Sequence, residues 1–259
     1  MVFSSNLAQR YEIFAWFKYY SDLCCNQTGV NILSEFGLFM YNTKEIAVLF
    51  DFDGVIMDTE TQYSIFWHQV GVDYLSMPDL ETRVKGQTLN YIYNTFFAEM
   101  VEKQKEITEA LNHFEQEMSY DYVPGAEEFV ADLRRSGVKM AVVTSSNEVK
   151  MAAVYRRHPE VKNMFDHILT ADMFAHSKPD PDCFLLGMKV FGTTPQTTYV
   201  FEDSFNGLKA GMASGATVIG LTTTNSREDI SGLAHYVLDD FTGMTCEKLL
   251  KNYTFVPRT

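Results

Sequence analysis

The chain has 259 residues, 46% of them hydrophobic, so it can bury a sizeable core in one large domain or two modest ones. Acidic side chains number 34 against 21 basic ones, and the net charge of −13 argues against a surface that binds nucleic acid or an anionic membrane. No apolar run reaches the roughly 18 residues of a membrane span. Of the four cysteines, Cys24 and Cys25 are adjacent, and adjacent cysteines rarely bridge each other; with no metal-ligand spacing either, this favours a reducing cytoplasm.

Residues 1–39 differ in composition from the rest of the chain. They are rich in aromatic side chains, show no clear alternation, and lack the basic start and continuous apolar stretch of a signal peptide. Met40 stands just before the first convincing strand, so we predict that Met40 is the true start and that 1–39 is an N-terminal extension with no catalytic part. The alternative is an extra helical segment at residues 6–23 that packs on the core or on a partner.

The apolar run Ile46–Phe50 predicts a strand buried on both faces. The tetrad Asp51-Phe52-Asp53-Gly54 follows at its carboxyl end. Two carboxylates with this spacing can share one metal ion and one reacting group, and Gly54 lets the backbone turn tightly beside them.

A helical insertion is predicted for residues 58–123. Helix-like sequence dominates from Thr59 to Tyr120, without a good strand, and is interrupted by Pro78 and Gly86. A turn at 121–125 closes the insertion.

From residue 126 onward the pattern alternates between helices and strands. We predict helices at 126–135, from 147, and at 181–190, 204–214 and 246–251, and strands at 140–143, 168–170, 199–201, 217–221 and 234–238. This alternation predicts an α/β fold: a doubly wound parallel sheet, built from 40–57 and 124–259, with the helical insertion as a cap.

Polar residues follow several of these strands, and in a doubly wound sheet those strand ends open onto one crevice. They are Asp51 and Asp53, then Thr144-Ser145-Ser146-Asn147, and later Glu202-Asp203-Ser204, with Lys178 in a loop between them. Other residues have structural interpretations. Ser145 and Glu148 have capping-box spacing, Asp180 before Pro181 is typical of a helix cap, and Gly207, Gly211 and Gly215 suit close packing of a helix on the sheet.

At these residues the chain resembles the haloacid dehalogenase superfamily, in its β-phosphoglucomutase-like and sugar-phosphate phosphatase branch. The four family motifs match residues 51–55, 143–146, 178–179 and 202–204, in the family's order. The match covers about 40–259, and the insertion corresponds to the family's helical C1-type cap.

The resemblance implies phosphoryl transfer. Asp51 would attack phosphorus and form an aspartyl-phosphate, while Asp53 would protonate the leaving alkoxide and later deprotonate the hydrolytic water. Thr144 and Ser145 would bind phosphoryl oxygens, and Lys178 would neutralise their charge and that of Asp51.

The resemblance also implies a Mg²⁺ ion, which prefers hard oxygen ligands. Asp51, the backbone carbonyl of Asp53 and Asp203 would supply the protein ligands. Glu202 would hold a metal-bound water or share the metal.

Lys85-Gly86-Gln87-Thr88 lies where the family places its substrate-specificity loop, so Lys85, Gly86 and Gln87 are candidate substrate contacts. The alternative is a simple turn between helices. His176, close to Lys178 in sequence, is a further candidate.

The predicted function is a Mg²⁺-dependent phosphatase of a small phosphorylated metabolite, a sugar or polyol phosphate, acting as a monomer or weak homodimer. A hexose-phosphate mutase is the alternative, but this chain has Tyr63 where those mutases usually carry His and Leu89 where they carry an Arg for the distal phosphate. A non-catalytic phosphosugar sensor is a third possibility, against which the full set of catalytic groups argues.

Overall fold

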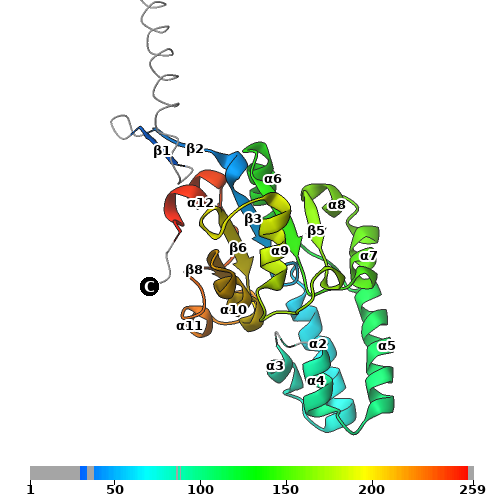
Figure 1. Ribbon diagram of the computed structural model, residues 1–259. Helices are drawn as coiled ribbons and strands as arrows, with labels where there is room; N and C mark the ends of the chain where they lie inside the picture. The colour runs from blue at the N-terminus through cyan, green and yellow to red at the C-terminus, as the bar shows by residue number, and fades with distance from the viewer. Residues whose placement is uncertain (1–29, 34–37, 86, 88, 256–259) are drawn as a thin grey trace, which may run out of the picture.

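The computed structural model describes residues 30–33, 38–85, 87 and 89–255. Its centre is a six-stranded parallel sheet with the order β5-β4-β3-β6-β7-β8 (Figure 1). The strands are β3 (Ala47–Phe50), β4 (Lys139–Val143), β5 (His167–Leu169), β6 (Thr198–Glu202), β7 (Thr217–Leu221) and β8 (Tyr236–Leu238). The predicted doubly wound parallel sheet is confirmed.

Strand β3 lies in the middle of the sheet, where the strand order reverses. Its residue Phe50 pairs with Val142 of β4 on one side and with Phe201 of β6 on the other. All four residues of β3 are buried, which explains why its sequence is a continuous apolar run instead of an alternating one. The carboxyl ends of β3, β4 and β6 therefore lie side by side at the switch point, where doubly wound folds bind ligands.

Two layers of helices cover the sheet (Figure 1). One layer packs around a cluster that includes the rings of Phe50, Phe129, Phe201 and Phe241, whose centroids are 5.2–6.2 Å apart. Its helices are α6 (Ala126–Arg135), α7 (Glu148–Arg157), α8 (Val161–Met164) and α12 (Cys246–Asn252). The opposite layer consists of α9 (Asp182–Phe191), α10 (Phe205–Ser214) and the short α11 (Arg227–Ile230).

The glycines of α10 pack as predicted only in part. A side chain at Gly211 would lie 3.0 Å from Val218, so this position does serve close packing of the helix on the sheet. Gly215 instead ends α10 with a φ of +82°, a left-handed conformation that favours glycine.

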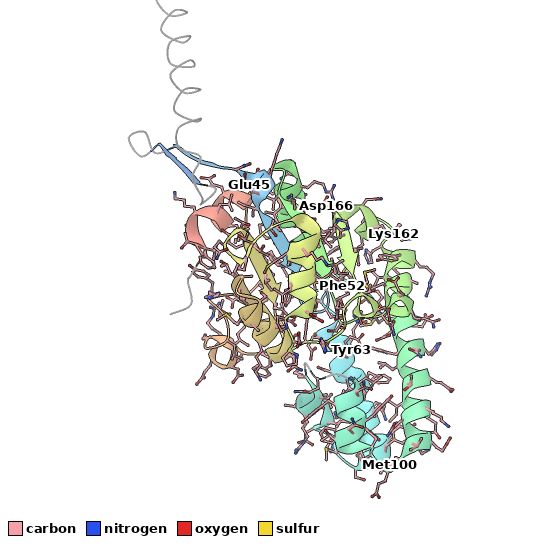
Figure 2. All side chains as sticks on the ribbon, viewed as in Figure 1. Glu45, Phe52, Tyr63, Met100, Lys162 and Asp166 are labelled. Atoms are coloured by element: carbon pink, nitrogen blue, oxygen red, sulfur yellow. The ribbon has the colours of Figure 1, made fainter. Side chains whose placement is uncertain are left out.

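The region between β3 and α6 forms a helical unit beyond the carboxyl ends of the strands (Figure 1). It contains α2 (Glu60–Val70), the π-helical turn η2 (Gly71–Leu75), α3 (Leu80–Val84), α4 (Leu89–Phe96) and α5 (Val101–Glu117). The unit has its own apolar core, made of Trp67, Val70, Leu80, Val84, Ile92, Phe97, Ile107 and Leu111. Figure 2 shows Tyr63 at the side of the unit next to the sheet and Met100 at its far end.

Two short strands precede the sheet, β1 (Val30–Leu33) and β2 (Leu38–Tyr41), and pair antiparallel. The sequence pattern predicted no strand before residue 40, whereas β2 passes through Met40, which pairs with Asn31. The alternative helix at 6–23 lies outside the described residues, and the start at Met40 stays a prediction. Among the helices of the described residues, none is long and apolar enough to cross a membrane.

Candidate active site

Lys178 and Asp51 form the centre of the candidate site. The Lys178 ammonium lies 2.6 Å from Asp51 Oδ1, 2.7 Å from Glu202 Oε1 and 3.0 Å from the carbonyl oxygen of Val143. An ammonium has three protons to donate, so these contacts use them all. Because the three acceptors lie at the ends of β3, β4 and β6, the lysine joins the carboxyl ends of three neighbouring strands.

Burial and charge shift the pKa values of this pair. Burial raises the pKa of Asp51 to about 7, although the charge of Lys178 opposes the rise and the charges of Glu202 and Asp53 add to it. Burial alone would lower the pKa of Lys178, but the charges of Asp51 and Glu202 outweigh it and raise that pKa. The lysine is therefore a permanent cation, but it is shared between Asp51 and Glu202 and compensates only part of the cost of burying the Asp51 charge.

A third acid completes a carboxylate cluster. Asp51, Glu202 and Asp203 are all buried, and each offers an oxygen within 4.8 Å of the others. Burial, followed by the charges of Glu202 and Asp51, raises the pKa of Asp203 well above its usual range. Its Oδ1 atom is buried without a hydrogen-bond partner among the described residues, while Oδ2 accepts from the hydroxyl of Thr224. A buried, unpartnered carboxylate oxygen beside two further acids fits a hard divalent cation such as Mg²⁺.

Gly54 makes room for this cluster. A Cβ atom at this position would lie 2.0 Å from Asp203 Oδ2, and the residue has a φ of +72°. The glycine of the sequence tetrad thus serves both the turn and the close approach of the Asp203 carboxylate.

Both carboxylate oxygens of Glu202 accept hydrogen bonds from other groups of the protein. Its Oε2 accepts from the amides of Asp203 and Ser204, each at 2.9 Å, and from the Ser204 hydroxyl at 3.0 Å. Since Oε1 already accepts from Lys178, both oxygens are engaged, and Glu202 acts as an anchor for Lys178 and for the start of α10. Gly207 leaves space for this carboxylate, because a Cβ there would lie 1.6 Å from Oε1. Because Glu202 is the last residue of β6, Gly207 lets α10 approach the sheet closely, as predicted.

The polar residues that follow β4 have different roles. Thr144 is buried, and its hydroxyl oxygen accepts from the amide of Ser146 at 3.0 Å, which leaves its proton to donate to a ligand. Ser145 is exposed, and its predicted phosphate contact stays a prediction.

The capping box predicted for Ser145 and Glu148 is wrong: α7 begins later, and Asn147 caps it by accepting from the backbone amide of Lys150 at 3.0 Å. The Glu148 carboxylate accepts from the Thr170 hydroxyl instead.

Asp53 has a partner that the sequence analysis missed. The ammonium of Lys150, in the first turn of α7, lies 2.6 Å from both of its carboxylate oxygens. The hydroxyl of Thr59 donates to Oδ1 at 2.8 Å and that of Ser146 to Oδ2 at 2.9 Å. Burial would raise the pKa of Asp53, but the charge and hydrogen bonds of Lys150, with the two hydroxyls, lower it. A cation in the first turn of a helix interacts unfavourably with the helix dipole, and this unusual position of Lys150 was the signal in the sequence that could have identified it.

Lys85 reaches from the helical unit to the core. Its ammonium donates to the carbonyl oxygen of Thr224 at 3.3 Å and lies 3.6 Å from Glu60 Oε1. Since the Thr224 hydroxyl contacts Asp203, Lys85 lies next to the carboxylate cluster. Gln87 is half-buried, and its backbone N–H donates to the carbonyl oxygen of Val84. Gly86 lies outside the described residues.

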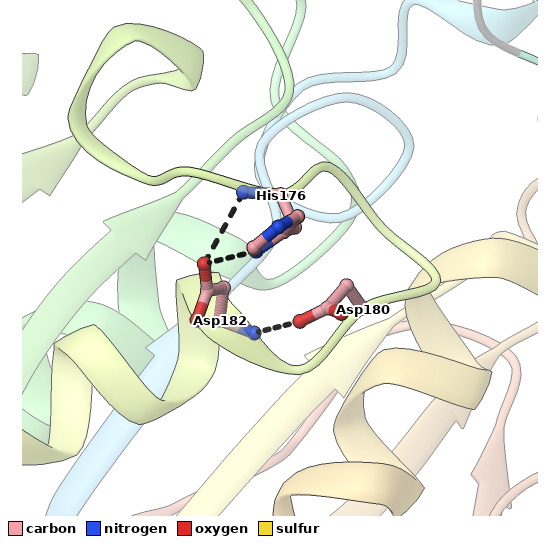
Figure 3. Close-up of side chains that lie close together, drawn as sticks. All are labelled: His176, Asp180 and Asp182. Atoms are coloured by element: carbon pink, nitrogen blue, oxygen red, sulfur yellow. Dashed lines mark hydrogen bonds and ion pairs between the residues drawn. The ribbon is translucent and has the colours of Figure 1, made fainter.

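His176 lies in a different cluster. Its Nδ1 is 2.9 Å from Asp182 Oδ2, and its side chain is 69% exposed. Figure 3 shows His176, Asp180 and Asp182 grouped at the start of α9. The carboxylate of Asp180 accepts from the backbone amide of Asp182 at 3.0 Å, but α9 begins at Asp182 with Pro181 at its N-cap, so the predicted cap at Asp180 is wrong by one position. The structure does not bring His176 into contact with the Asp51 cluster.

The chain matches known proteins across most of this architecture. The family model for haloacid dehalogenase-like hydrolases matches residues 48–221. The chain is 29% identical over 195 residues to the chloroplastic protein SUPPRESSOR OF QUENCHING 1 of Arabidopsis thaliana, a match that covers 71% of this chain but 18% of that protein. It is 27% identical over 181 residues to a phosphorylated carbohydrates phosphatase of Thermotoga maritima, covering 65% of this chain and 81% of the relative.

Solved structures agree on the fold. A crystal structure of β-phosphoglucomutase from Clostridium difficile superposes with a TM-score of 0.64 at 23% identity, covering 80% of this chain and 96% of that one. At this identity the similarity supports the architecture alone.

Proposed function

The chain belongs to the haloacid dehalogenase-like hydrolases, and on this basis we propose that it is a Mg²⁺-dependent phosphatase that hydrolyses a small sugar or polyol phosphate. The observation that carries the proposal is the buried pair of Asp51 and Lys178, 2.6 Å apart, beside the unpartnered Oδ1 of Asp203. Phosphoryl transfer depends on positioning and charge neutralisation, and this arrangement supplies a fixed nucleophile, a fixed cation and a place for a second cation.

Asp51 would act as the nucleophile. Its carboxylate attacks phosphorus in line, the bond between phosphorus and the ester oxygen breaks, and Asp51 becomes an aspartyl-phosphate. Lys178 stays against the carboxylate and neutralises charge as the phosphoryl group arrives, while the Thr144 hydroxyl donates to a phosphoryl oxygen. Ser145 is a further candidate contact.

Mg²⁺, held by Asp51, Asp203 and the backbone carbonyl of Asp53, would neutralise phosphoryl charge when bound. Of the predicted metal residues, Glu202 fits an outer position, because its oxygens already accept from Lys178 and from the start of α10.

Asp53 would move the protons. In the substrate complex, where the negative charge of the phosphate opposes the lowering of its pKa by Lys150, Asp53 would carry a proton. It gives this proton to the leaving ester oxygen, and the resulting carboxylate then takes one from the water that attacks the aspartyl-phosphate. This second step regenerates Asp51 and releases inorganic phosphate, so the net reaction is hydrolysis of the monoester. Both steps need Asp53 to face the side of the phosphorus atom from which the ester oxygen leaves and the water then attacks, and its carboxylate lies at the boundary between the helical unit and the core.

A phosphatase is favoured over a mutase by the residues of the helical unit. Tyr63 occupies the position where the mutases usually carry a histidine, and its hydroxyl is engaged by Glu115 at 2.7 Å. Leu89 supplies no cation for a second phosphate. Lys85 remains a candidate contact for the hydroxyl-bearing part of a substrate, together with Gln87.

Turnover of phosphorylated metabolites and of p-nitrophenyl phosphate, with and without Mg²⁺, tests the proposal. We expect release of inorganic phosphate that requires Mg²⁺ and falls at least about 10³-fold in Asp51→Asn. Asp180→Asn is the matched control, because it changes an exposed acid just before α9. Equal rates for Asp51→Asn and the unmodified protein would contradict the nucleophile assignment. Conversion of glucose 1-phosphate to glucose 6-phosphate with a bisphosphate primer, without phosphate release, would establish the mutase instead.

A further inference from the structure

Lys150 is a buried cation that belongs to none of the four sequence motifs. It lies in the first turn of α7, its side chain is 6% exposed, and its ammonium lies 2.6 Å from each oxygen of Asp53. The same ammonium lies 4.8 Å from the centre of the Tyr63 ring, which belongs to α2 of the helical unit. Burying a cation at this end of a helix is unfavourable on its own, so the contacts of Lys150 must compensate for it.

The hydrogen bonds of Asp53 define how its carboxylate is oriented. Lys150 contacts both oxygens, and Thr59 and Ser146 contact one each. A carboxylate has about four acceptor positions, so the set is complete. The two hydroxyl contacts are the weaker ones, because a charged donor forms a stronger hydrogen bond than a neutral one. An incoming ligand oxygen would therefore displace a hydroxyl and leave Lys150 in place.

The exposed fractions of the Asp53 and Lys150 side chains agree with displacement of a hydroxyl by the ligand while Lys150 stays in place. The Asp53 side chain is 28% exposed, whereas that of Lys150 is 6% exposed. The carboxylate thus faces the accessible side, and the ammonium lies behind it. Contacts from the core (Ser146, Lys150) and from the start of the helical unit (Thr59) meet on this one side chain.

We propose that Lys150 is a positioning residue that holds the carboxylate of Asp53 toward the leaving-group oxygen of the substrate. This inference rests on the proposed phosphatase function. Through the Tyr63 ring, Lys150 also links the orientation of Asp53 to the placement of α2. No bond to Lys150 forms or breaks in the reaction; it acts only through Asp53.

Leaving groups provide a specific test. The alkoxide of a sugar or polyol needs a proton as it departs, whereas p-nitrophenolate departs without one. A misplaced Asp53 should therefore lower kcat/KM for an alkyl phosphate much more than for p-nitrophenyl phosphate. A general loss of structure would lower both.

The experiment compares Lys150→Met, Lys150→Arg and the unmodified protein on both substrates with Mg²⁺. We expect Lys150→Met to lower kcat/KM for the best alkyl phosphate by about 10²-fold, mainly through kcat, and to change the value for p-nitrophenyl phosphate by less than about threefold. Lys150→Arg should restore most of the alkyl rate, since it keeps a cation. Arg156→Met, which removes an exposed cation from the same helix, should leave both substrates unaffected.

Other outcomes overturn the inference. Equal losses on both substrates would show a structural role, and a faster alkyl rate in Lys150→Met would show that Lys150 restrains Asp53. If Lys150→Met does not fold, Lys150→Gln carries the same comparison. An unmodified protein that hydrolyses neither substrate would overturn the proposed function, whereas an active one with an unchanged substrate ratio in the variants would overturn only the role of Lys150.

Discussion

The side chain of Asp51 contacts a group of the core, whereas the side chain of Asp53 contacts groups from both the core and the helical unit. Lys178, Glu202 and Asp203 contact or adjoin Asp51, and all belong to strand ends or to loops of the core. Asp53 accepts from Thr59, which precedes α2, as well as from Lys150 on α7.

The two sides also differ in how closed they are. The side chain of Asp51 is 11% exposed and that of its partner Lys178 is 6% exposed, while the side chain of Asp53 is 28% exposed. The Asp51 side suits a step that is the same for every phosphate ester. Under the proposed mechanism, Asp53 would meet the leaving group, which is the variable part of the substrate, and this suits a position at the boundary between the two units.

The largest effect is expected from Lys178→Met, which removes the cation from the Asp51 side. Asp51 and Glu202 would be left buried without their partner, and breaking such a pair costs about 3–5 kcal/mol. We expect kcat to fall at least about 10³-fold, since a fixed charge at the reacting phosphoryl group is lost. Phosphate release and urea unfolding measure the two effects.

Lys189→Met is the control for this variant, because Lys189 is an exposed cation on α9. We expect it to change neither quantity appreciably. If Lys178→Met keeps more than a tenth of the activity for both aryl and alkyl phosphates, the charge on the Asp51 side is not needed, and the contrast between the two sides fails.

Mg²⁺ should stabilise the protein in a pH-dependent manner. The pKa of Asp51 is raised from 3.8 to about 7, so between these values the folded protein holds a proton that the unfolded chain has released. In the absence of metal, stability should therefore fall as the pH rises through this window. Mg²⁺ binds the deprotonated carboxylates, and at a concentration of 100 times its Kd it should add about 2.7 kcal/mol at pH 8.

Thermal unfolding with Mg²⁺ or with a chelator, at pH 5 and pH 8, measures this difference. The stabilisation should be smaller at pH 5, where protons compete with the metal for Asp51 and Asp203. Asp203→Asn should reduce it at both values, while Asp180→Asn, on the exposed cluster of Figure 3, should not. Equal stabilisation at both pH values would mean that Mg²⁺ binds elsewhere.

The Asp51 side was predictable from sequence because parallel strands end at one edge of the sheet. Each polar motif follows an apolar run, so strand periodicity alone places Asp51, Thr144 and Glu202 at neighbouring ends. The structure confirms this sheet and the closeness of these groups, and Lys178 joins them from a loop.

The Asp53 side was less predictable because its contacts depend on packing between separate elements. Lys150 is distant from Asp53 in sequence, and in a helix pattern a lysine is usually a solvated residue. Only the packing of α7 against α5 and against the main apolar core turns it inward. The hairpin of β1 and β2 was missed for a related reason, since short strands carry few residues from which to read a period.

The smallest expected effect concerns the start of α7, which lies between the two sides of the site. Asn147 caps the helix, so Asn147→Ala should cost about 1 kcal/mol of stability, whereas Ser145→Ala should cost only a few tenths. Urea unfolding of both variants measures the difference. The reverse order would restore the capping box that the sequence predicted. Because Ser145 is exposed and uninvolved in the cap, a loss of activity in Ser145→Ala without a loss of stability would identify it as a phosphate contact, and would extend the Asp51 side by one residue along the loop.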